Sequence, residues 1–130
     1  MLLNAMNLGA CGVEQLFCAG KVSFATEGIE KGIDLVELKG NYIVTKAAVV
    51  VKTAFNAGTT NVLTVGVNDG ADDLLGSEDV TEGTIGENGK TMFKMCNDGA
   101  LKVRAKFTST GTAATAGEAE IYIGLVRIPE

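Results

Sequence analysis

The feature that most constrains this chain is an alternation of apolar and polar residues with a period of two, which begins at Lys21. Its clearest example is ALKVRAKF at residues 100–107, where apolar and basic side chains alternate. This period is typical of a β-strand with one buried and one solvated face. Similar short segments, separated by Gly, Asn and Asp, occupy residues 21–25, 32–40, 41–55, 61–67, 91–97 and 120–128. The pattern predicts seven or eight strands and no long helix after residue 20, as in a sandwich, jelly roll or small barrel.

Length and composition indicate one all-β domain with its own core. The chain has 130 residues, of which 46% are hydrophobic but only 5% aromatic, and 17 are glycine. Folding at this length buries roughly two-thirds of the unfolded surface, enough for a core without metals or disulfides. Between two predicted strands, Asp98-Gly99 is a strong signal for a hairpin turn. The predicted fold class is an all-β, β-sandwich or jelly-roll-like single domain.

The first twenty residues, MLLNAMNLGACGVEQLFCAG, differ from the rest because they carry one charge and no alternation. Their large apolar side chains are Leu2, Leu3, Met6, Leu8, Leu16 and Phe17. A compact sandwich offers little to cover six such residues. We therefore expect residues 1–20 to form an extended or short-helical N-terminal arm that binds a partner, and residues 21–130 to form the β-sandwich domain.

Two predicted strands, around residues 47–51 and 121–126, are apolar on both faces. One layer of sheet cannot bury both faces inside a single sandwich, so another part of the chain or another subunit must cover the second face. Val50 and Tyr122 mark that second face. We expect a homo-oligomer, a dimer or trimer, in which these two residues lie at the contact.

Charge and the absence of histidine argue against several functions. Eleven basic and 16 acidic residues give a net charge of -5, whereas nucleic-acid binding normally requires a basic surface. Without histidine the chain lacks the most common general base and zinc ligand. No apolar run approaches the ~20 residues of a membrane span. We expect a soluble protein with no nucleic-acid or membrane partner and no enzymatic activity.

The three cysteines, Cys11, Cys18 and Cys96, are odd in number and have no metal-binding spacing. No histidine is present to activate any of them as a nucleophile. We expect reduced thiols in a protein made in the cytoplasm of its host, and no catalytic residues.

The stretch TIGENGKTMF, residues 84–93, ends in the Gly-Lys-Thr of a phosphate-binding loop. That motif requires a first glycine where Thr84 stands, a buried strand before it and a helix after it. The following residues alternate as strands do, and without a helix N-terminus no row of free N–H groups can hold phosphates. The sequence therefore predicts a turn entering a strand and no bound nucleotide or other cofactor.

Residues 68–90 are rich in glycine and acidic residues and are predicted to form a long loop. The acidic cluster consists of Asp69, Asp72, Asp73, Glu78 and Asp79. Aligning Gly70 with the invariant glycine of an EF-hand loop would place Val65 and Val67 at ligand positions, and valine cannot coordinate calcium. A solvated loop is favoured over a metal site, although a cation site of another type remains open.

Two stretches resemble a known group of proteins. AAVVVKTAFNAGTTNVLTVGV (47–67) and KFTSTGTAATAGEAEIYIGLVRI (106–128) are similar in their strand and turn phrasing to small virion proteins of tailed bacteriophages, namely head-decoration or cement proteins. The resemblance covers about half of the chain. It implies a jelly-roll or related sandwich that sits as an oligomer on the capsid surface and attaches through extended termini.

The sequence therefore predicts a structural virion protein, a capsid decoration protein that binds and stabilises the shell of major capsid protein. Within virion proteins the alternative is a head-tail connector or tail component. From another class, the alternative is a carbohydrate- or cell-surface-binding module, although such modules usually present exposed aromatic residues and this chain has no Trp.

Overall fold

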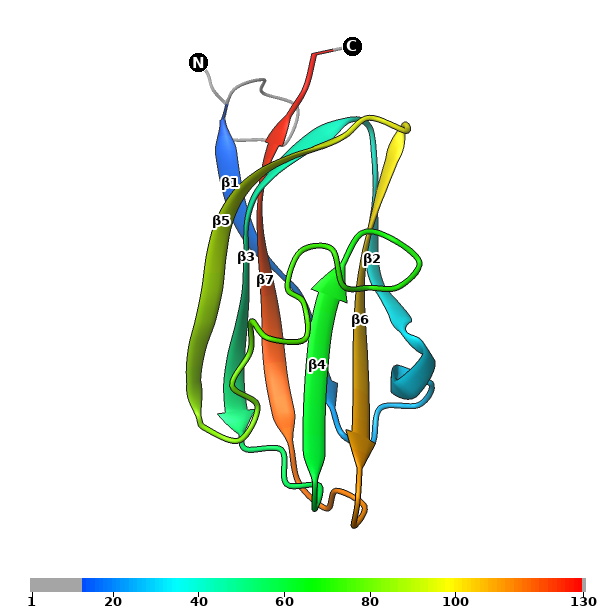
Figure 1. Cartoon of the computed structure of the whole chain (residues 1–130). Coiled ribbons are helices and arrows are strands. Elements are labelled where there is room, and N and C mark those ends of the chain that lie inside the picture. The colour runs from blue at the N-terminus through cyan, green and yellow to red at the C-terminus, as the bar shows by residue number, and fades with distance from the viewer. Residues whose placement is uncertain (1–12, 130) are drawn as a thin grey trace.

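The computed structural model describes residues 13–129 as two antiparallel sheets that face one another (Figure 1). Sheet I has the strand order β1-β7-β3-β5 and sheet II the order β2-β6-β4. The elements are β1 (Glu14–Ser23), η1 (Ile29–Lys31), β2 (Ile33–Lys39), β3 (Tyr42–Thr53), β4 (Thr60–Gly66), β5 (Gly86–Cys96), β6 (Ala100–Thr110) and β7 (Glu118–Arg127). The predicted all-β sandwich fold is confirmed.

Every connection between successive strands crosses from one sheet to the other. β1, β3, β5 and β7 lie in sheet I, and β2, β4 and β6 lie in sheet II, so no strand pairs with its neighbour in sequence. Such long-range antiparallel pairing is the hallmark of a jelly roll. The predicted hairpin at Asp98-Gly99 is therefore wrong. Gly99 does take the positive φ of 88° that a tight turn requires, but the turn passes the chain to the opposite sheet.

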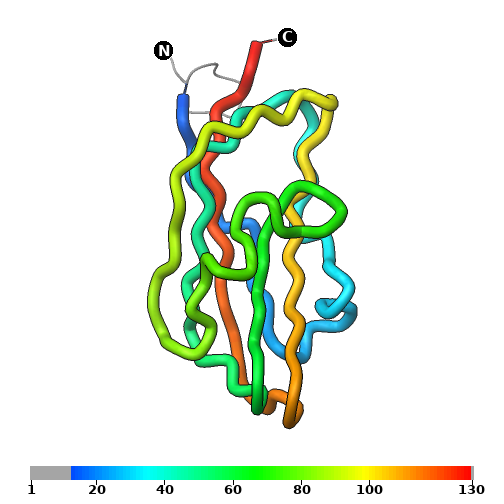
Figure 2. The backbone as a smooth tube through the Cα atoms, in the orientation of Figure 1, coloured from blue at the N-terminus to red at the C-terminus, as the bar shows by residue number. Residues whose placement is uncertain are grey.

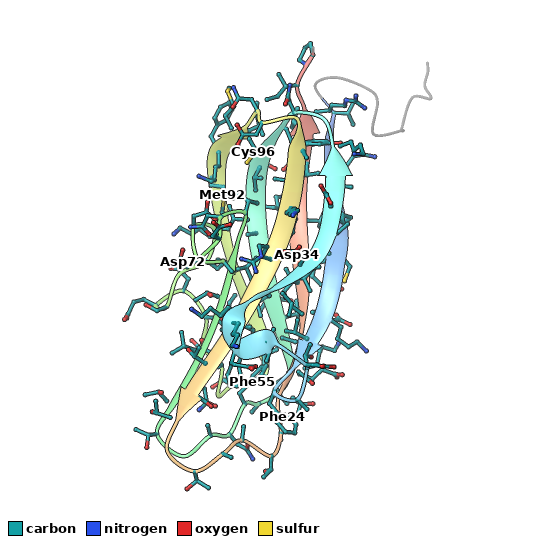
Figure 3. All side chains as sticks on the ribbon, turned by 90° about the vertical axis from the view of Figure 1, so that its right-hand side faces the viewer. Phe24, Asp34, Phe55, Asp72, Met92 and Cys96 are labelled. Atoms are coloured by element: carbon teal, nitrogen blue, oxygen red, sulfur yellow. The ribbon has the colours of Figure 1, made fainter. Side chains whose placement is uncertain are left out.

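The core lies between the sheets and is built from the alternating inward side chains of the strands. Its largest fully buried side chains are Leu63, Leu74, Leu75, Leu101, Ile121, Ile123, Leu125, Val22, Val44, Val49, Val51 and Val65. The rings of Phe55 and Phe107 pack within this core with their centroids 4.7 Å apart (Figure 3 labels Phe55). One contiguous cluster thus accounts for the apolar inner faces of the strands.

The N-terminal arm predicted for residues 1–20 is wrong in its second half. Residues 14–20 belong to β1, which pairs with β7 from Glu14 to Ser23. A bulge between Cys18 and Gly20 shifts the register, so that Ala19 and Val22 are both buried although they are three residues apart. The bulge conceals the two-residue alternation in the sequence. The arm prediction for residues 1–12 lies outside the described residues.

Residues 67–85 cover the free edge of β4 (the green loop in Figure 2). The Leu63 N–H donates to Glu82 Oε2 at 2.8 Å, and the Val65 N–H donates to the Leu75 carbonyl at 3.0 Å. A sheet edge normally leaves such groups unpaired. The loop therefore acts as a substitute for an eighth strand, and Glu82 is buried at the edge of sheet II as part of it.

The same loop is tied to β5, across the opening between the sheets. Asp73 accepts the Val67 N–H at 2.8 Å and forms an ion pair with Lys94 at 3.3 Å. Asp79 forms a second ion pair, with Lys90, also at 3.3 Å. The sequence predicts a solvated acidic cluster in this loop. Two of its members, Asp73 and Asp79, are instead structural, because they join the loop beside sheet II to the edge strand of sheet I.

Candidate interaction surface

The outer face of sheet I is unusually poor in charge along its middle. The register places Cys18, Tyr122, Ala48 and Gly89 side by side, one from each strand. Paired residues in a sheet project from the same face. Because the flanking residues of β3 and β7 point into the core, this row faces away from it. It is a row of small and aromatic residues that crosses all four strands of the sheet.

Next to this strip lies an apolar patch, which we call the outer patch, made of Leu16, Ile43, Phe93, Met95 and Val126. The register aligns Val126, Ile43 and Met95 in one row across three strands. Leu16, Phe93 and Met95 are 60%, 76% and 55% exposed, which is high for large apolar side chains. Large exposed apolar side chains gathered on one face of a domain make that face a candidate interaction site.

A polar bridge crosses the centre of the outer patch. Glu14 on β1 forms an ion pair with Lys46 on β3 at 3.8 Å and also accepts a hydrogen bond from Thr45. These side chains pass over β7 at Gly124, where a Cβ would lie only 2.7 Å from Lys46 Cγ. Glycine at position 124 thus allows β1 and β3 to be joined above the sheet. The otherwise apolar patch therefore contains one ion pair, in which the charges of Glu14 and Lys46 balance each other.

The structure places Val50 and Tyr122 on the outer face of sheet I, as the two-sided strands predict. Val50 is half-buried and stands opposite Glu120 and Glu87 on the neighbouring strands. The Tyr122 hydroxyl donates to Glu120 at 3.0 Å, and this bond to the carboxylate raises the pKa of Tyr122. Coverage of this face by another subunit remains a prediction.

The apolar residues assigned to the arm are divided by the structure. Leu16 lies on the outer face of sheet I, whereas Phe17 points the other way and packs against the core. Phe17 also lines a small apolar groove with Leu38 at the β1 edge of the sandwich. Leu2, Leu3, Met6 and Leu8 lie outside the described residues.

Sequence reasoning missed the β5 part of the outer patch. The segment TMFKMC, residues 91–96, places Met92 and Cys96 on the inner face and Phe93 and Met95 on the outer face (Figure 3 labels Met92 and Cys96). This is the two-sided apolar pattern that singled out residues 47–51. The same test applied to β5 would have found Phe93 and Met95.

The outer face of sheet II is polar and internally neutralised. The Arg104 guanidinium donates to Asp34 Oδ1 at 2.7 Å and to the Gly32 carbonyl at 3.1 Å, and it also donates to the Asp69 carbonyl. Lys102 contacts Asp34 at 3.8 Å (Asp34 is labelled in Figure 3). Two basic residues of β6, Lys102 and Arg104, are therefore engaged within the domain, and Arg104 joins β2, Gly32 and the 67–85 loop.

The Gly-Lys-Thr motif lies inside a strand. Gly89, Lys90 and Thr91 pair with residues of β3, and the chain continues from β5 into β6 with no helix between them. Lys90 is engaged by Asp79. The predicted turn entering a strand is misplaced, because residues 87–89 already belong to β5. A P-loop holds phosphates with free N–H groups at a helix N-terminus, whereas this motif is paired within a sheet.

Residues 13–129 contain no group of three or more Cys, Asp or Glu side chains placed to hold a metal ion. The N–H of Gly76 and the ammonium of Lys90 lower the pKa of Asp79, so its carboxylate is committed to the loop. Burial raises the pKa of the Cys96 thiol, which makes it a poorer nucleophile. Within this part of the chain, no helix is long and apolar enough to cross a membrane.

The fold and surface thus define a seven-stranded, jelly-roll-like sandwich with an apolar outer face and no catalytic arrangement among its described residues. A chain of the cyanophage Pam1 capsid asymmetric unit shares this fold, with a TM-score of 0.67 and 20% sequence identity. The match covers 98% of this chain and 94% of that chain. It therefore spans nearly the whole of two chains of similar length.

Infectious bursal disease virus VP2, from a subviral particle, matches with a TM-score of 0.49 and 10% identity, over 90% of this chain and 34% of that chain. Similarity at that level carries no weight for the fold or the function. No protein-family model matches the sequence, and no curated protein matches it significantly.

Proposed function

We propose that this protein is a structural virion protein of a tailed bacteriophage, a decoration protein that binds the shell of major capsid protein and stabilises it. The observation that carries the proposal is the similarity over nearly the whole length of both chains to a chain of a cyanophage capsid asymmetric unit. The independent resemblance of residues 47–67 and 106–128 to decoration proteins supports the same role.

The stabilising mechanism would be burial of apolar surface across joints between capsid subunits. The outer patch offers three large, exposed side chains, Leu16, Phe93 and Met95. Full burial of each is worth roughly 1.5–3 kcal/mol, from which the cost of immobilising the protein must be subtracted. A dimer or trimer would bring several patches to the shell at once, and binding at several sites strengthens attachment without new contacts.

Residues 1–12 are the second proposed attachment element, because they include Leu2, Leu3, Met6 and Leu8. β1 begins at Glu14, beside the outer patch. Deletion of residues 1–12 therefore leaves every described strand intact and removes only the apolar segment. We expect the truncated protein to fold as the full chain does and to bind the capsid more weakly.

The test compares intact particles, particles stripped of this protein, and stripped particles to which the full-length protein is added back. Stripped particles should break at a lower temperature or under a weaker osmotic shock, and addition of the protein should restore their resistance. A connector or tail component would instead be located at one vertex or along the tail. If stripped particles are as robust as intact ones, the stabilising role is wrong.

A further inference from the structure

β5 has a free edge along its whole length. It pairs with β3 on one side, and within residues 13–129 no backbone–backbone hydrogen bond reaches it on the other side. The loop contacts β5 through side chains only, as where the Thr81 N–H donates to Asn88 Oδ1 at 3.0 Å. In Figure 1 it forms the rim of the molecule beside β3. The edge of β4 is covered by residues 67–85, and the ladders of β1, β2 and β5 each shift register once along their length. β5 is the edge strand that carries two of the large exposed apolar side chains, Phe93 and Met95.

Exposed apolar side chains concentrate on this strand. Of the four large apolar residues that are exposed within the described chain, Ile85 precedes β5 directly, and Phe93 and Met95 lie on it. An open, apolar edge strand is a template for pairing with another strand, and natural proteins usually protect such edges with charge, bulges or covering loops.

Two lysines on the inner side of β5 are the charges that could keep other strands away. Lys90 and Lys94 stand opposite the buried Ala47 and Val44 of β3. Each is bound within its own chain, however, to Asp79 and Asp73 respectively, at 3.3 Å. The two aspartates therefore largely balance the positive charge of these lysines. The edge is less protected against pairing with another strand than its sequence indicates.

We propose that β5 pairs in antiparallel fashion with β5 of a second copy of this chain, about a two-fold axis at Thr91. A two-fold axis perpendicular to the sheet keeps outer side chains opposite outer ones. Such an axis lies midway between one residue and the same residue of the second copy. Only an axis at Thr91, the central residue of Gly86–Cys96, pairs all eleven residues of the strand. Sheet I of one copy and sheet I of the second copy then form one continuous sheet. This inference does not depend on the virion role.

The charges favour the same register. An axis at Lys90 would place Lys90 opposite itself, and an axis at Met92 would place Lys90 opposite Lys94. Like charges directly opposite one another destabilise a strand pair. With the axis at Thr91, Lys90 faces Met92 and Lys94 faces Asn88 of the second copy, and no like charges meet.

The central register also covers the most exposed aromatic residue. On the outer face, Phe93 of each copy lies opposite Gly89 of the other, where the absent side chain leaves room for the ring. This contact occurs twice because a two-fold interface uses the same surface on both copies. It would bury the side chain that is 76% exposed in the single chain.

The test is disulfide cross-linking in the full-length chain with Cys11, Cys18 and Cys96 replaced by alanine. Residues directly opposite in an antiparallel pair have Cα atoms about 4.5–5.5 Å apart, within the range for a disulfide. Thr91→Cys should therefore form a covalent dimer under mild oxidation. Glu87→Cys is the matched control, since the register separates its two copies by about 27 Å along the strand.

A second measurement is the mass of the unmodified protein by sedimentation. The wild type should be a dimer, and Phe93→Lys should weaken the dimer about tenfold or more. Leu16 is also a large exposed apolar residue but lies on the opposite edge of sheet I, so Leu16→Lys should leave the mass unchanged. A monomer or trimer at every concentration, or a dimer in which Thr91→Cys cross-links no better than Glu87→Cys, overturns the proposal.

Discussion

Mutation of Glu82 tests whether residues 67–85 take the place of an eighth strand at the edge of β4. Its buried carboxylate accepts the Leu63 N–H at 2.8 Å, on the edge of β4. A hydrogen bond to a charged group contributes about 1.5–3 kcal/mol, and its loss leaves a buried donor unpaired. We expect Glu82→Ala to lower the free energy of unfolding by about 2–3 kcal/mol. A domain of this kind has only about 5–15 kcal/mol in total.

Urea unfolding measures this difference directly, with the slope of the transition as a check that the compactness of the two end states is unchanged. Glu82→Gln keeps an acceptor oxygen and most of the packing, so it should cost about 1 kcal/mol. Glu78→Ala, in an exposed part of the same loop, is the matched control and should stay within about 0.5 kcal/mol of the wild type. If Glu82→Ala is as stable as Glu78→Ala, the loop does not support β4 in the way described.

Three further changes test other parts of the structure. Because the Gly76 N–H and Lys90 lower the pKa of Asp79, its ionised form stabilises the fold above about pH 4 and this contribution is lost on acidification; Asp79→Asn should therefore flatten the fall of the melting temperature between pH 5 and pH 2.5, and an unchanged pH profile would contradict the assignment. The buried Thr64 hydroxyl has no hydrogen-bond partner within the described residues, so Thr64→Val should raise the free energy of unfolding by about 1 kcal/mol, and a loss of stability in urea would show that the hydroxyl is satisfied. Millimolar Mg·ATP should not change the melting temperature of the wild type or of Lys90→Ala, whereas a rise confined to the wild type would restore the nucleotide site.

Alternation predicted most of the strands because their inner faces pack on one core. The segment at residues 100–107 lies within β6, and the odd-numbered residues 101–107 are all buried. Local patterns could not predict which sheet a strand joins. Asp98-Gly99 has the chemistry of a tight turn, and Gly99 forms one, but the next strand pairs with β2 and β4. That choice depends on long-range contacts.

Residues 14–20, the first part of β1, escaped prediction for a different reason. The bulge between Cys18 and Gly20 changes which face the later residues occupy, so residues 14–23 show no regular period. The site was only partly predictable. The apolar residues on both faces of β3 and β7 pointed to the outer face of sheet I, but its exposed edge on β5 depends on strand order, which the sequence alone does not reveal.

The most direct test of the central claim is an electron cryomicroscopy map of purified particles of the virus that encodes this chain, compared with particles lacking the gene. The account predicts density for a two-sheet sandwich of this size on the outside of the shell, repeated over the capsid lattice and absent from the deletion particles. The outer face of sheet I or the N-terminal segment should meet the shell or a neighbouring copy. Identical maps of the two particles, or density confined to a single vertex or to the tail, would contradict the decoration role.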